Sequence, residues 1–198
     1  MISAIVLAAG ASSRMGQAKA ALPLGNTGET VVGRVVRTLL DGGIPRVVVV
    51  AGAHIDAVRH ALSAHEPRAR LVEHPRWEQG QLSSLIAGLN AIDDPLLEGA
   101  MVTLVDVPLV SAATVAAVIS AWRTTHAPIV RPANGDRHGH PVMFDRSVFD
   151  DLRAANPNAG AKAVFAAHRD RIVNVEVNDP GAFEDIDTPG DYERLIGR

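Results

Sequence analysis

Short strand-like runs alternate with helical stripes through the first two thirds of the chain, and this alternation constrains the fold more than any other feature. The runs are rich in Val, Ile and Leu, whereas the stripes repeat apolar residues at helical spacing. Strands are predicted near residues 5–7, 46–50, 70–73 and 100–105, and helices near 31–40, 56–64, 82–89 and 115–122. Because such alternation brings right-handed crossovers, we predict an α/β fold in three layers, with a mostly parallel, Rossmann-like sheet between two layers of helices.

The last third of the chain alternates less regularly. We predict strands over residues 127–131 and 142–144, separated by a polar loop over 132–141. The prediction is completed by helices over 146–154, 160–168 and 189–196 and by a strand over 171–177. No Pro-, Gly- or Ser-rich linker divides the 198 residues, and we therefore expect a single domain over residues 1–198.

Composition excludes several classes of protein. The formal net charge is −3, which argues against general nucleic-acid binding because that function needs a basic surface. Cysteine is absent, so disulfides and thiolate metal sites are excluded. No apolar run is long enough to span a membrane, and no basic segment precedes the first strand. We therefore expect neither a membrane span nor a signal peptide, and we expect the protein in the cytoplasm.

A loop of small residues follows the first strand. Leu7, Ala8, Ala9 and Gly10 place little side chain between the backbone and a molecule lying on it, and Gly10 and Gly16 permit left-handed backbone angles. Backbone amides in such a loop can reach the base and ribose of a nucleotide. We therefore predict that residues 7–10 bind a nucleotide.

Two cations in the same loop, Arg14 and Lys19, suit the phosphates of a nucleoside triphosphate. Two well-known glycine loops are excluded. The P-loop has four residues between its glycines, whereas five separate Gly10 from Gly16, and the dinucleotide fingerprint needs a glycine where Ser12 stands. A strand followed by a flexible basic loop is the remaining alternative.

Residues 7–19 fit the pattern Leu-Ala-Ala-Gly-x-Ser-x-Arg-Met-Gly-x-x-Lys. This pattern resembles the N-terminal signature of the nucleotidyltransferases of the molybdenum cofactor family, within the wider glycosyltransferase-A-like group. The resemblance implies that Arg14 and Lys19 bind the triphosphate and stabilise the negative charge that develops in catalysis. It also implies a Mg²⁺-dependent reaction, in the cytidylyltransferase branch the transfer of CMP from CTP to a molybdopterin-type cofactor with release of pyrophosphate.

Asp106 ends the strand predicted at residues 100–105, and Pro108 stiffens the chain after it. In open α/β sheets ligands bind outside the carboxyl ends of strands, so this carboxylate is placed to hold a Mg²⁺ ion that bridges phosphate oxygens. An ordinary turn or a helix cap is the alternative. The resemblance implies the metal role, because the family has an Asp-x-Pro metal ligand at this point, and it makes Asp106 a catalytic residue.

Residues 185–192 resemble the closing Asp-x-Asp-Thr-Pro-x-Asp motif of the same family. The resemblance implies that its second aspartate, Asp187, is a further Mg²⁺ ligand. Asp187 or Thr188 can also cap a helix that begins at Pro189, and one residue can serve both roles. Asp185 remains a competitor for the metal, although the proline favours Asp187 because it holds the neighbouring backbone.

Gly80, Gln81 and Ser83 precede or begin the helix predicted at residues 82–89 and resemble the Gly-x-x-Ser-Ser-Leu segment of the cytidylyltransferase branch. Glycine permits close approach of a ligand to the backbone, and the polar side chains can bond to a base edge or a ribose hydroxyl. We predict that these three residues bind the nucleotide. The alternative is a helix start with serine as its cap.

Residues 139–142, Gly-His-Pro-Val, resemble a family motif on the acceptor side of the cleft, which implies acceptor binding by Gly139 and His140. A structural loop histidine is the alternative, and zinc is not expected because His138 and His140 would point to opposite faces of a strand. Lys162, the third predicted acceptor residue, stands where the cytidylyltransferase branch has arginine, so the bidentate fork is lost. We expect the other histidines at the surface: His54, His60, His65, His74, His126 and His168.

The predicted function is nucleotide transfer from an NTP, with CTP favoured, to a phosphorylated small-molecule acceptor. A sugar-1-phosphate or another small phosphate is the alternative acceptor. Two alternatives of other classes are a non-catalytic cofactor carrier or chaperone for molybdenum enzymes and a dinucleotide-dependent oxidoreductase, which the absent fingerprint disfavours. The protein partner that the resemblance implies is a molybdenum hydroxylase that receives the product.

Overall fold

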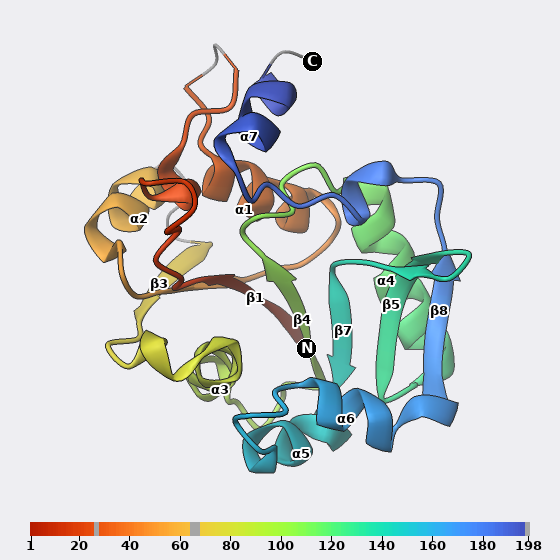
Figure 1. The fold of residues 1–198 in the computed structure, drawn as a ribbon. Coiled ribbons are helices and arrows are strands. Elements are labelled where there is room, and N and C mark those ends of the chain that lie inside the picture. The colour runs from red at the N-terminus through yellow and green to blue at the C-terminus, as the bar shows by residue number, and fades with distance from the viewer. Residues whose placement is uncertain (26–27, 64–67, 197–198) are drawn as a thin grey trace.

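The structure, a computed structural model, describes residues 1–25, 28–63 and 68–196. One sheet runs through the molecule in the order β3-β2-β1-β4-β7-β5-β6, with β8 paired to β5, and helices cover both of its faces (Figure 1). The strands are β1 (Ile2–Ala8), β2 (Val47–Ala51), β3 (Ala69–Glu73), β4 (Gly99–Leu104), β5 (Ile129–Asn134), β6 (Arg137–His138), β7 (Val142–Asp145) and β8 (Ile172–Glu176). The helices are α1 (Val31–Asp41), α2 (Ile55–Leu62), α3 (Gln81–Ile92), α4 (Ala112–Thr125), α5 (Phe149–Ala154), α6 (Lys162–Ala167) and α7 (Pro189–Ile196).

Strand direction divides the sheet into two parts. β3, β2, β1 and β4 are parallel, and the pairing of β1 with β4 sets Leu7 beside Leu104. β7 is antiparallel to both β4 and β5, and β8 is parallel to β5. Among the described strands only β6 and β7 therefore run against the others, and the predicted three-layer, mostly parallel α/β fold is confirmed.

Two apolar layers enclose the sheet. Successive residues of a strand point to opposite faces, so Val6 and Val49 face one layer whereas Ile5 and Val50 face the other. Helices α1, α2 and α4 pack on the first face, and α3, α5 and α6 pack on the second. Because β1 and β2 are buried on both faces, their sequences are continuous apolar runs without polar alternation.

The segment over residues 132–141 is not the polar loop that the sequence predicts. β5 continues to Asn134, and β6 returns antiparallel to it with His138 opposite Ala133. The turn between them is Gly135-Asp136, and Gly135 has a φ of 57°, which suits the first position of a two-residue hairpin turn. Glycine followed by aspartate between two strands is a hairpin signal that the polar composition of the segment obscured.

The other predicted helices and strands are present, with boundaries shifted by a few residues. The helix predicted over residues 146–154 is divided into a 3₁₀ turn, Arg146–Val148, and α5. Residue 64, the predicted end of the second helix, lies outside the described residues, as does His65. None of the described helices is both long enough and apolar enough to cross a membrane.

Candidate active site

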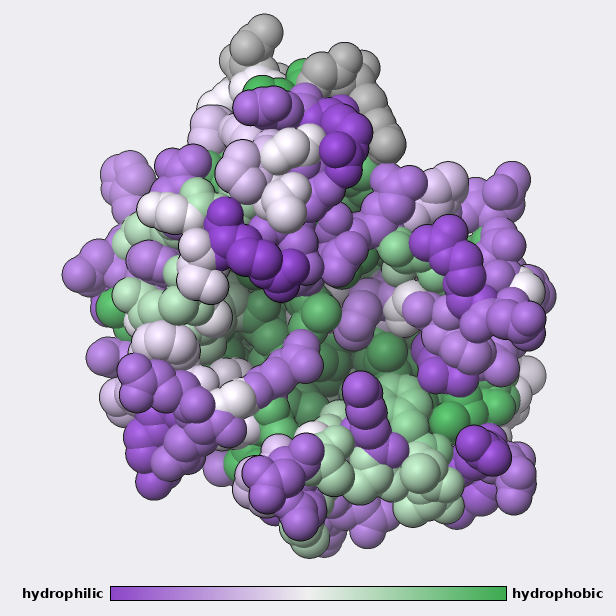
Figure 2. Space-filling model, viewed as in Figure 1, coloured by the Kyte–Doolittle hydropathy of each residue, from purple (hydrophilic) through white to green (hydrophobic). Residues whose placement is uncertain are grey.

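A cavity of about 460 Å³, which we call the first cavity, lies at the carboxyl ends of β1 and β4. Figure 2 shows this face of the molecule hollowed at its centre, with hydrophobic side chains in the floor and hydrophilic ones around the rim. Widely separated stretches of the chain meet here. The predicted site residues that line the first cavity are Leu7, Ala8, Ala9, Gly10, Arg14, Lys19, Gly80, Gln81, Asp106 and Asp187.

The loop after β1 takes its shape from Ser12 and Gly16. These two residues have φ angles of 50° and 68°, whereas Gly10 does not have a left-handed angle, so the conformational role predicted for Gly10 is wrong. A Cβ atom at Gly10 would meet no atom within 4 Å, which means that glycine leaves open space above the backbone beside the cavity. The Ser12 hydroxyl accepts a hydrogen bond from the backbone N–H of Lys19 (3.3 Å), which ties the end of the loop to its middle.

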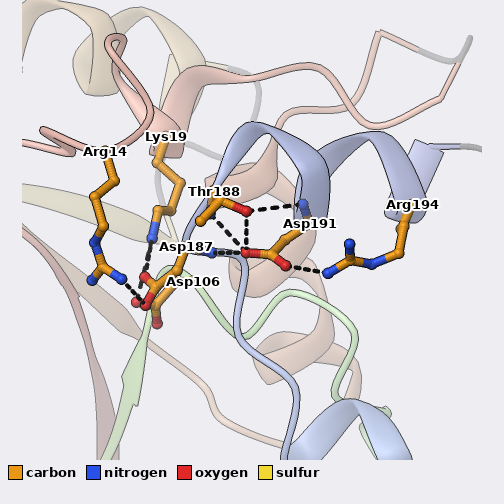
Figure 3. Close-up of polar contacts among 7 residues, drawn as sticks. All are labelled: Arg14, Lys19, Asp106, Asp187, Thr188, Asp191 and Arg194. Carbon is orange, nitrogen blue, oxygen red and sulfur yellow. Dashed lines mark hydrogen bonds and ion pairs between the residues drawn. The ribbon is translucent and has the colours of Figure 1, made fainter.

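Four charged side chains that line the first cavity contact one another (Figure 3). Lys19 Nζ lies 3.0 Å from Asp187 Oδ1 and 3.6 Å from Asp106 Oδ2. Arg14 reaches the same aspartate, with Nη1 2.9 Å from Asp187 Oδ2. The Lys19 side chain is only 9% exposed, whereas that of Arg14 is 68% exposed. The fold thus joins both predicted phosphate-binding cations to both predicted metal ligands.

Asp106 is fixed by β4 and by a contact with the C-terminal segment, since the Ile186 N–H donates to the Asp106 carbonyl (2.8 Å). Burial raises the pKa of Asp106 above its ordinary value, Lys19 opposes that rise, and the carboxylates of Asp187 and Asp185 add to it. Asp106 Oδ1 is buried and has no hydrogen-bond partner in the part of the chain that the structure describes. A buried carboxylate oxygen without a partner is costly, so Oδ1 is the atom of this side chain that is open to a ligand from outside the chain.

Asp187 is positioned by the first turn of α7 (Figure 3). Asp191 Oδ2 accepts hydrogen bonds from the backbone N–H groups of Asp187 (3.1 Å) and Thr188 (2.7 Å). Thr188 Oγ1 accepts in return from the Asp191 N–H (3.2 Å), so Thr188 is the cap in a capping box. The Asp187 carboxylate is thereby left free to face Lys19, whose hydrogen bond lowers the pKa of Asp187.

Asp106 and Asp187 are the pair of residues that could hold a divalent cation. Lys19 Nζ contacts both carboxylates and Arg14 contacts Asp187, so a divalent cation would take over positions that these two side chains occupy in this structure. Asp185 is exposed and lines a different cavity, beside Leu109. No group of three or more His, Asp or Glu residues suited to a metal occurs among the described residues. Two carboxylates, completed by phosphate oxygens and water, match the coordination that Mg²⁺ prefers.

The turn before α3 presents backbone groups to the first cavity. Gly80, with a φ of 95°, and Gln81 line the cavity, but Ser83 does not. The Ser83 hydroxyl donates to the Gly80 carbonyl (2.7 Å) and lies 2.9 Å from His74 Nε2. Because the hydroxyl has one hydrogen, His74 is the donor in that second bond. Ser83 therefore supports the turn, and Ser84 lines the cavity in its place.

Several residues beside the first cavity have no sequence signal of their own. His74 is buried, so its predicted surface position is wrong, and that burial lowers its pKa. His54 lines the cavity, and its Nε2 lies 2.9 Å from the Ala11 carbonyl. Trp77 lines the cavity as well, packed so tightly on Gly52 that a Cβ there would lie 2.5 Å from the indole Cγ. A lone histidine or tryptophan becomes visible as a site residue only when the fold assembles its neighbours.

A second cavity, of about 530 Å³, adjoins the first and shares Leu7, Gln81 and Leu104 with it. The three predicted acceptor residues, Gly139, His140 and Lys162, all line this second cavity. Its other lining is mainly apolar, and the larger apolar residues that the first cavity does not share come from α3, β4, β7 and α6: Leu82, Leu85, Val102, Val142, Phe144 and Phe165.

The three acceptor residues differ in what holds them. Gly139 packs so closely on the C-terminal segment that a Cβ would lie 2.1 Å from the Ala182 carbonyl oxygen, so its glycine serves packing. Burial lowers the pKa of His140 although a hydrogen bond with the Val102 backbone opposes the shift, and His140 Nδ1 is buried without a partner among the described residues. Lys162 is exposed at the start of α6.

Comparison with known proteins identifies relatives over the whole chain. The family described as MobA-like NTP transferase domain matches residues 4–172. Nicotine blue oxidoreductase of Paenarthrobacter nicotinovorans is 32% identical over 98% of this chain and 96% of that protein. Molybdenum cofactor cytidylyltransferase of Escherichia coli K12 is 25% identical over 96% of this chain and 93% of that protein.

The solved structures of Rv0371c from Mycobacterium tuberculosis are also similar. One matches with a TM-score of 0.83 at 29% identity, covering 100% of this chain and 98% of that one. Another, a complex with manganese, matches with a TM-score of 0.78 at 28% identity, covering 99% of this chain and 98% of that one. These findings confirm the resemblance that the loop over residues 7–19 indicates. The chain belongs to the MobA-like NTP transferase domain family, and its enzyme class is that of the nucleotidyltransferases.

Proposed function

We propose that this protein transfers CMP from CTP to the phosphate of a molybdopterin-type cofactor and releases pyrophosphate, with Mg²⁺ as the metal. The observation that carries the proposal is the cluster of Arg14, Lys19, Asp106 and Asp187 in the first cavity, next to a second cavity that shares its wall. A phosphate oxygen of the acceptor attacks the α-phosphorus of CTP, and the bond from that phosphorus to the bridging oxygen of pyrophosphate breaks. Such chemistry needs positioning and neutralised charge more than a covalent nucleophile.

The ion pairs indicate how the chain's own residues act. Lys19 and Arg14 exchange their carboxylate partners for the oxygens of the triphosphate and stabilise the charge that develops on the leaving pyrophosphate. That exchange frees Asp106 and Asp187, which are the residues that would hold Mg²⁺. The bound metal would supply charge neutralisation on the phosphates. Manganese in a solved structure of Rv0371c supports the use of a divalent cation by this chain.

The lining of the second cavity favours a heterocyclic acceptor over a sugar phosphate. A sugar needs several polar side chains to bond its hydroxyls, because each buried hydroxyl without a partner is costly. The described residues that line this cavity are mainly apolar and include Phe144 and Phe165, and the polar or charged side chains among them are four nitrogen-rich groups and two amides, with no carboxylate: Arg131, His138, His140, Lys162, Gln81 and Asn158. A flat ring system with a phosphate fits such a surface. Location in the cytoplasm and a molybdenum hydroxylase as recipient of the product belong to the same proposal.

Pyrophosphate release tests the proposal. The assay uses each of the four common NTPs with Mg²⁺, with and without purified molybdopterin, and Asp106→Asn as the matched control. The expected result is release with CTP that depends on molybdopterin and disappears in the control variant. Release with another NTP would show that the proposed base is wrong, and release with a sugar-1-phosphate would show that the proposed acceptor is wrong. Binding of CTP without any release would indicate a carrier instead of an enzyme.

An oxidoreductase is a second candidate function, because nicotine blue oxidoreductase is 32% identical to this chain over nearly its full length. The loop after β1 lacks the dinucleotide fingerprint, since Ser12 stands where a glycine is needed, which disfavours this candidate. Titration with NADH, followed by its fluorescence, separates the two candidates. We expect no saturable change in fluorescence, and saturable binding that CTP does not displace would favour the oxidoreductase.

A further inference from the structure

A cation that the sequence motifs do not contain lies in the wall of the second cavity. Arg131, in the middle of β5, is half-buried and lines this cavity together with Lys162. Two contacts hold its side chain. Arg131 Nε donates to Asn174 Oδ1 on β8 (3.0 Å), and the guanidinium carbon lies 5.5 Å from the centre of the Phe165 ring. The guanidinium is therefore fixed in position before any ligand binds.

Arg131 does not have an anionic partner within the described chain. It forms no ion pair there, and the lining of the second cavity contains no carboxylate. Burial lowers the pKa of the Arg131 guanidinium, and no acidic group opposes the shift. Arginine nevertheless stays charged in proteins, and among the described residues only Nε of Arg131 has a hydrogen-bond partner. The two terminal NH₂ groups of a held, partly desolvated cation are thus free to receive an anion from outside the chain.

The aromatic residues beside Arg131 indicate what accompanies that anion. Phe165 stands three residues after Lys162 on α6, so both occupy one side of the helix. Phe165 also meets Phe144 of β7 edge to face, with ring centroids 5.7 Å apart. The wall therefore combines two aromatic rings with a fixed guanidinium, and the exposed Lys162 lies beside them. This surface is complementary to a flat, apolar ring system that carries one anionic group.

We propose that Arg131, held by Asn174 and Phe165, is the residue that binds the anionic group of the acceptor and selects acceptors that combine an anion with a flat ring system. The inference rests on the proposed function, because it names the anion-binding residue of the acceptor cavity. Arg131 also supplies the two-pronged donor that Lys162 lacks. Lys162 is then an accessory cation.

Two fluorescent probes test this assignment without any nucleotide. 8-Anilinonaphthalene-1-sulfonate joins a flat naphthalene ring system to a phenyl ring and carries one anionic group, and N-phenyl-1-naphthylamine has the same two ring systems without a charge. We expect the wild type to bind the anionic probe more tightly. Arg131→Gln should weaken the binding of the anionic probe by about tenfold, which is the scale of one charge-assisted hydrogen-bond pair. The affinity for the neutral probe should not change. Arg131→Lys should recover part of the loss.

Matched variants separate a specific effect from a general one. Arg137→Gln removes an exposed cation of the neighbouring strand that stacks on Phe183 and does not line the second cavity, so it should leave both probes unchanged. Asn174→Ala keeps the charge of Arg131 but releases its Nε, and should weaken the anionic probe by about threefold. Thermal unfolding curves confirm that each variant is folded. If Arg131→Gln is not folded, the comparison of Asn174→Ala with the wild type decides.

Equal affinity of the wild type for the two probes would overturn the assignment. An unchanged anionic-probe affinity in folded Arg131→Gln, or an equal loss in Arg137→Gln, would overturn it as well. Failure of the proposed function is distinguishable from these outcomes. Absence of pyrophosphate release contradicts nucleotide transfer but does not alter the ratio of the two probe affinities, whereas normal release with no probe discrimination contradicts the role of Arg131 alone.

Discussion

The two cavities differ in how their cations are balanced. In the first cavity Arg14 and Lys19 are both paired with carboxylates of the chain. In the second cavity Arg131 and Lys162 have no ion pair among the described residues. A paired cation must exchange its partner before it can bind a ligand, whereas an unpaired cation can receive an anion directly.

This difference assigns separate tasks to the two cavities. If phosphate takes the place of the carboxylates as proposed, its arrival in the first cavity releases Asp106 and Asp187, so phosphate and metal are expected to bind together. The second cavity has no carboxylate to release among its described lining residues, and it can bind an anion without a metal. The following variants test that division, from the largest expected effect to the smallest.

Asp106→Asn should lower pyrophosphate release by about 10³-fold or more, because an amide cannot neutralise a divalent cation. Burial raises the pKa of Asp106, which means that its charged form does not stabilise the fold. The melting temperature of the variant should therefore be unchanged or slightly higher than that of the wild type. Steady-state rates and a thermal melt check both results. A folded variant with full activity, or a variant that does not fold, would contradict both the assignment of Asp106 as a metal ligand and the task assigned to the first cavity.

Asp187→Asn should lower activity by about 10²-fold, and Asp185→Asn by only a few-fold. The two residues form a matched pair, since Asp187 faces Lys19 in the first cavity whereas Asp185 is exposed beside a different cavity. Raising Mg²⁺ should recover part of the loss in Asp187→Asn if weakened metal binding is its cause. A larger loss in Asp185→Asn, or equal losses, would reverse the ranking of the two carboxylates.

Lys19→Ala and Arg14→Ala should each lower kcat/KM by about 10²-fold, with the larger loss at Lys19 because it is buried between two carboxylates. Lys19→Ala should also bind Mn²⁺ more tightly than the wild type does in the absence of nucleotide, because the competing cation is gone. Titration calorimetry with Mn²⁺ alone measures this effect. Unchanged Mn²⁺ affinity would show that Lys19 does not compete with the metal.

Asp179→Asn should give the smallest effect, a loss of about 1–2 kcal/mol in the free energy of unfolding at neutral pH. Asp179 Oδ2 accepts hydrogen bonds from Ser111 and Thr114 at the start of α4. Burial raises the pKa of Asp179, but these hydrogen bonds outweigh burial and lower it overall.

The sign of the pH dependence follows from that lowered pKa. The stabilisation by Asp179 is present above the ordinary carboxylate pKa of the unfolded chain and is lost as the pH falls through the lower folded value. Urea unfolding at neutral and acidic pH should therefore show a difference between wild type and Asp179→Asn that shrinks in acid. Asp179 lies near the segment that packs on Gly139, a residue of the second cavity. The variant should therefore lower ligand affinity at the second cavity more than at the first. A difference that grows in acid would contradict this account of Asp179.

The parallel half of the molecule could be predicted from its sequence, because β1 and β2 are buried on both faces and their apolar runs are continuous. The residues of the first cavity could be predicted as well, since Lys19, Asp106 and Asp187 lie in recognisable sequence motifs. The contact between Lys19 and Asp187 could not be predicted from the sequence, because it depends on a tertiary hydrogen bond, from the Ile186 N–H to the Asp106 carbonyl.

The antiparallel half was less predictable for a physical reason. The hairpin at Gly135 pairs residues that are only a few positions apart, Ala133 with His138 and Asn134 with Arg137, and its turn signal lies within a segment whose polar composition is typical of a loop. Arg131 lies in an apparently ordinary strand, and its importance comes from Asn174 and Phe165, which are distant in the sequence. His74 and Trp77 escaped prediction in the same way.

Binding of CTP with MgCl₂, measured by titration calorimetry in the wild type, Lys19→Ala and Arg131→Gln, tests the division of tasks most directly. Both substitutions remove one cation, so net charge is matched between the variants. We predict that Lys19→Ala weakens CTP binding by about tenfold or more, while Arg131→Gln binds CTP as the wild type does. Equal weakening in both variants, or a larger loss in Arg131→Gln, would contradict the assignment of the nucleotide to the first cavity.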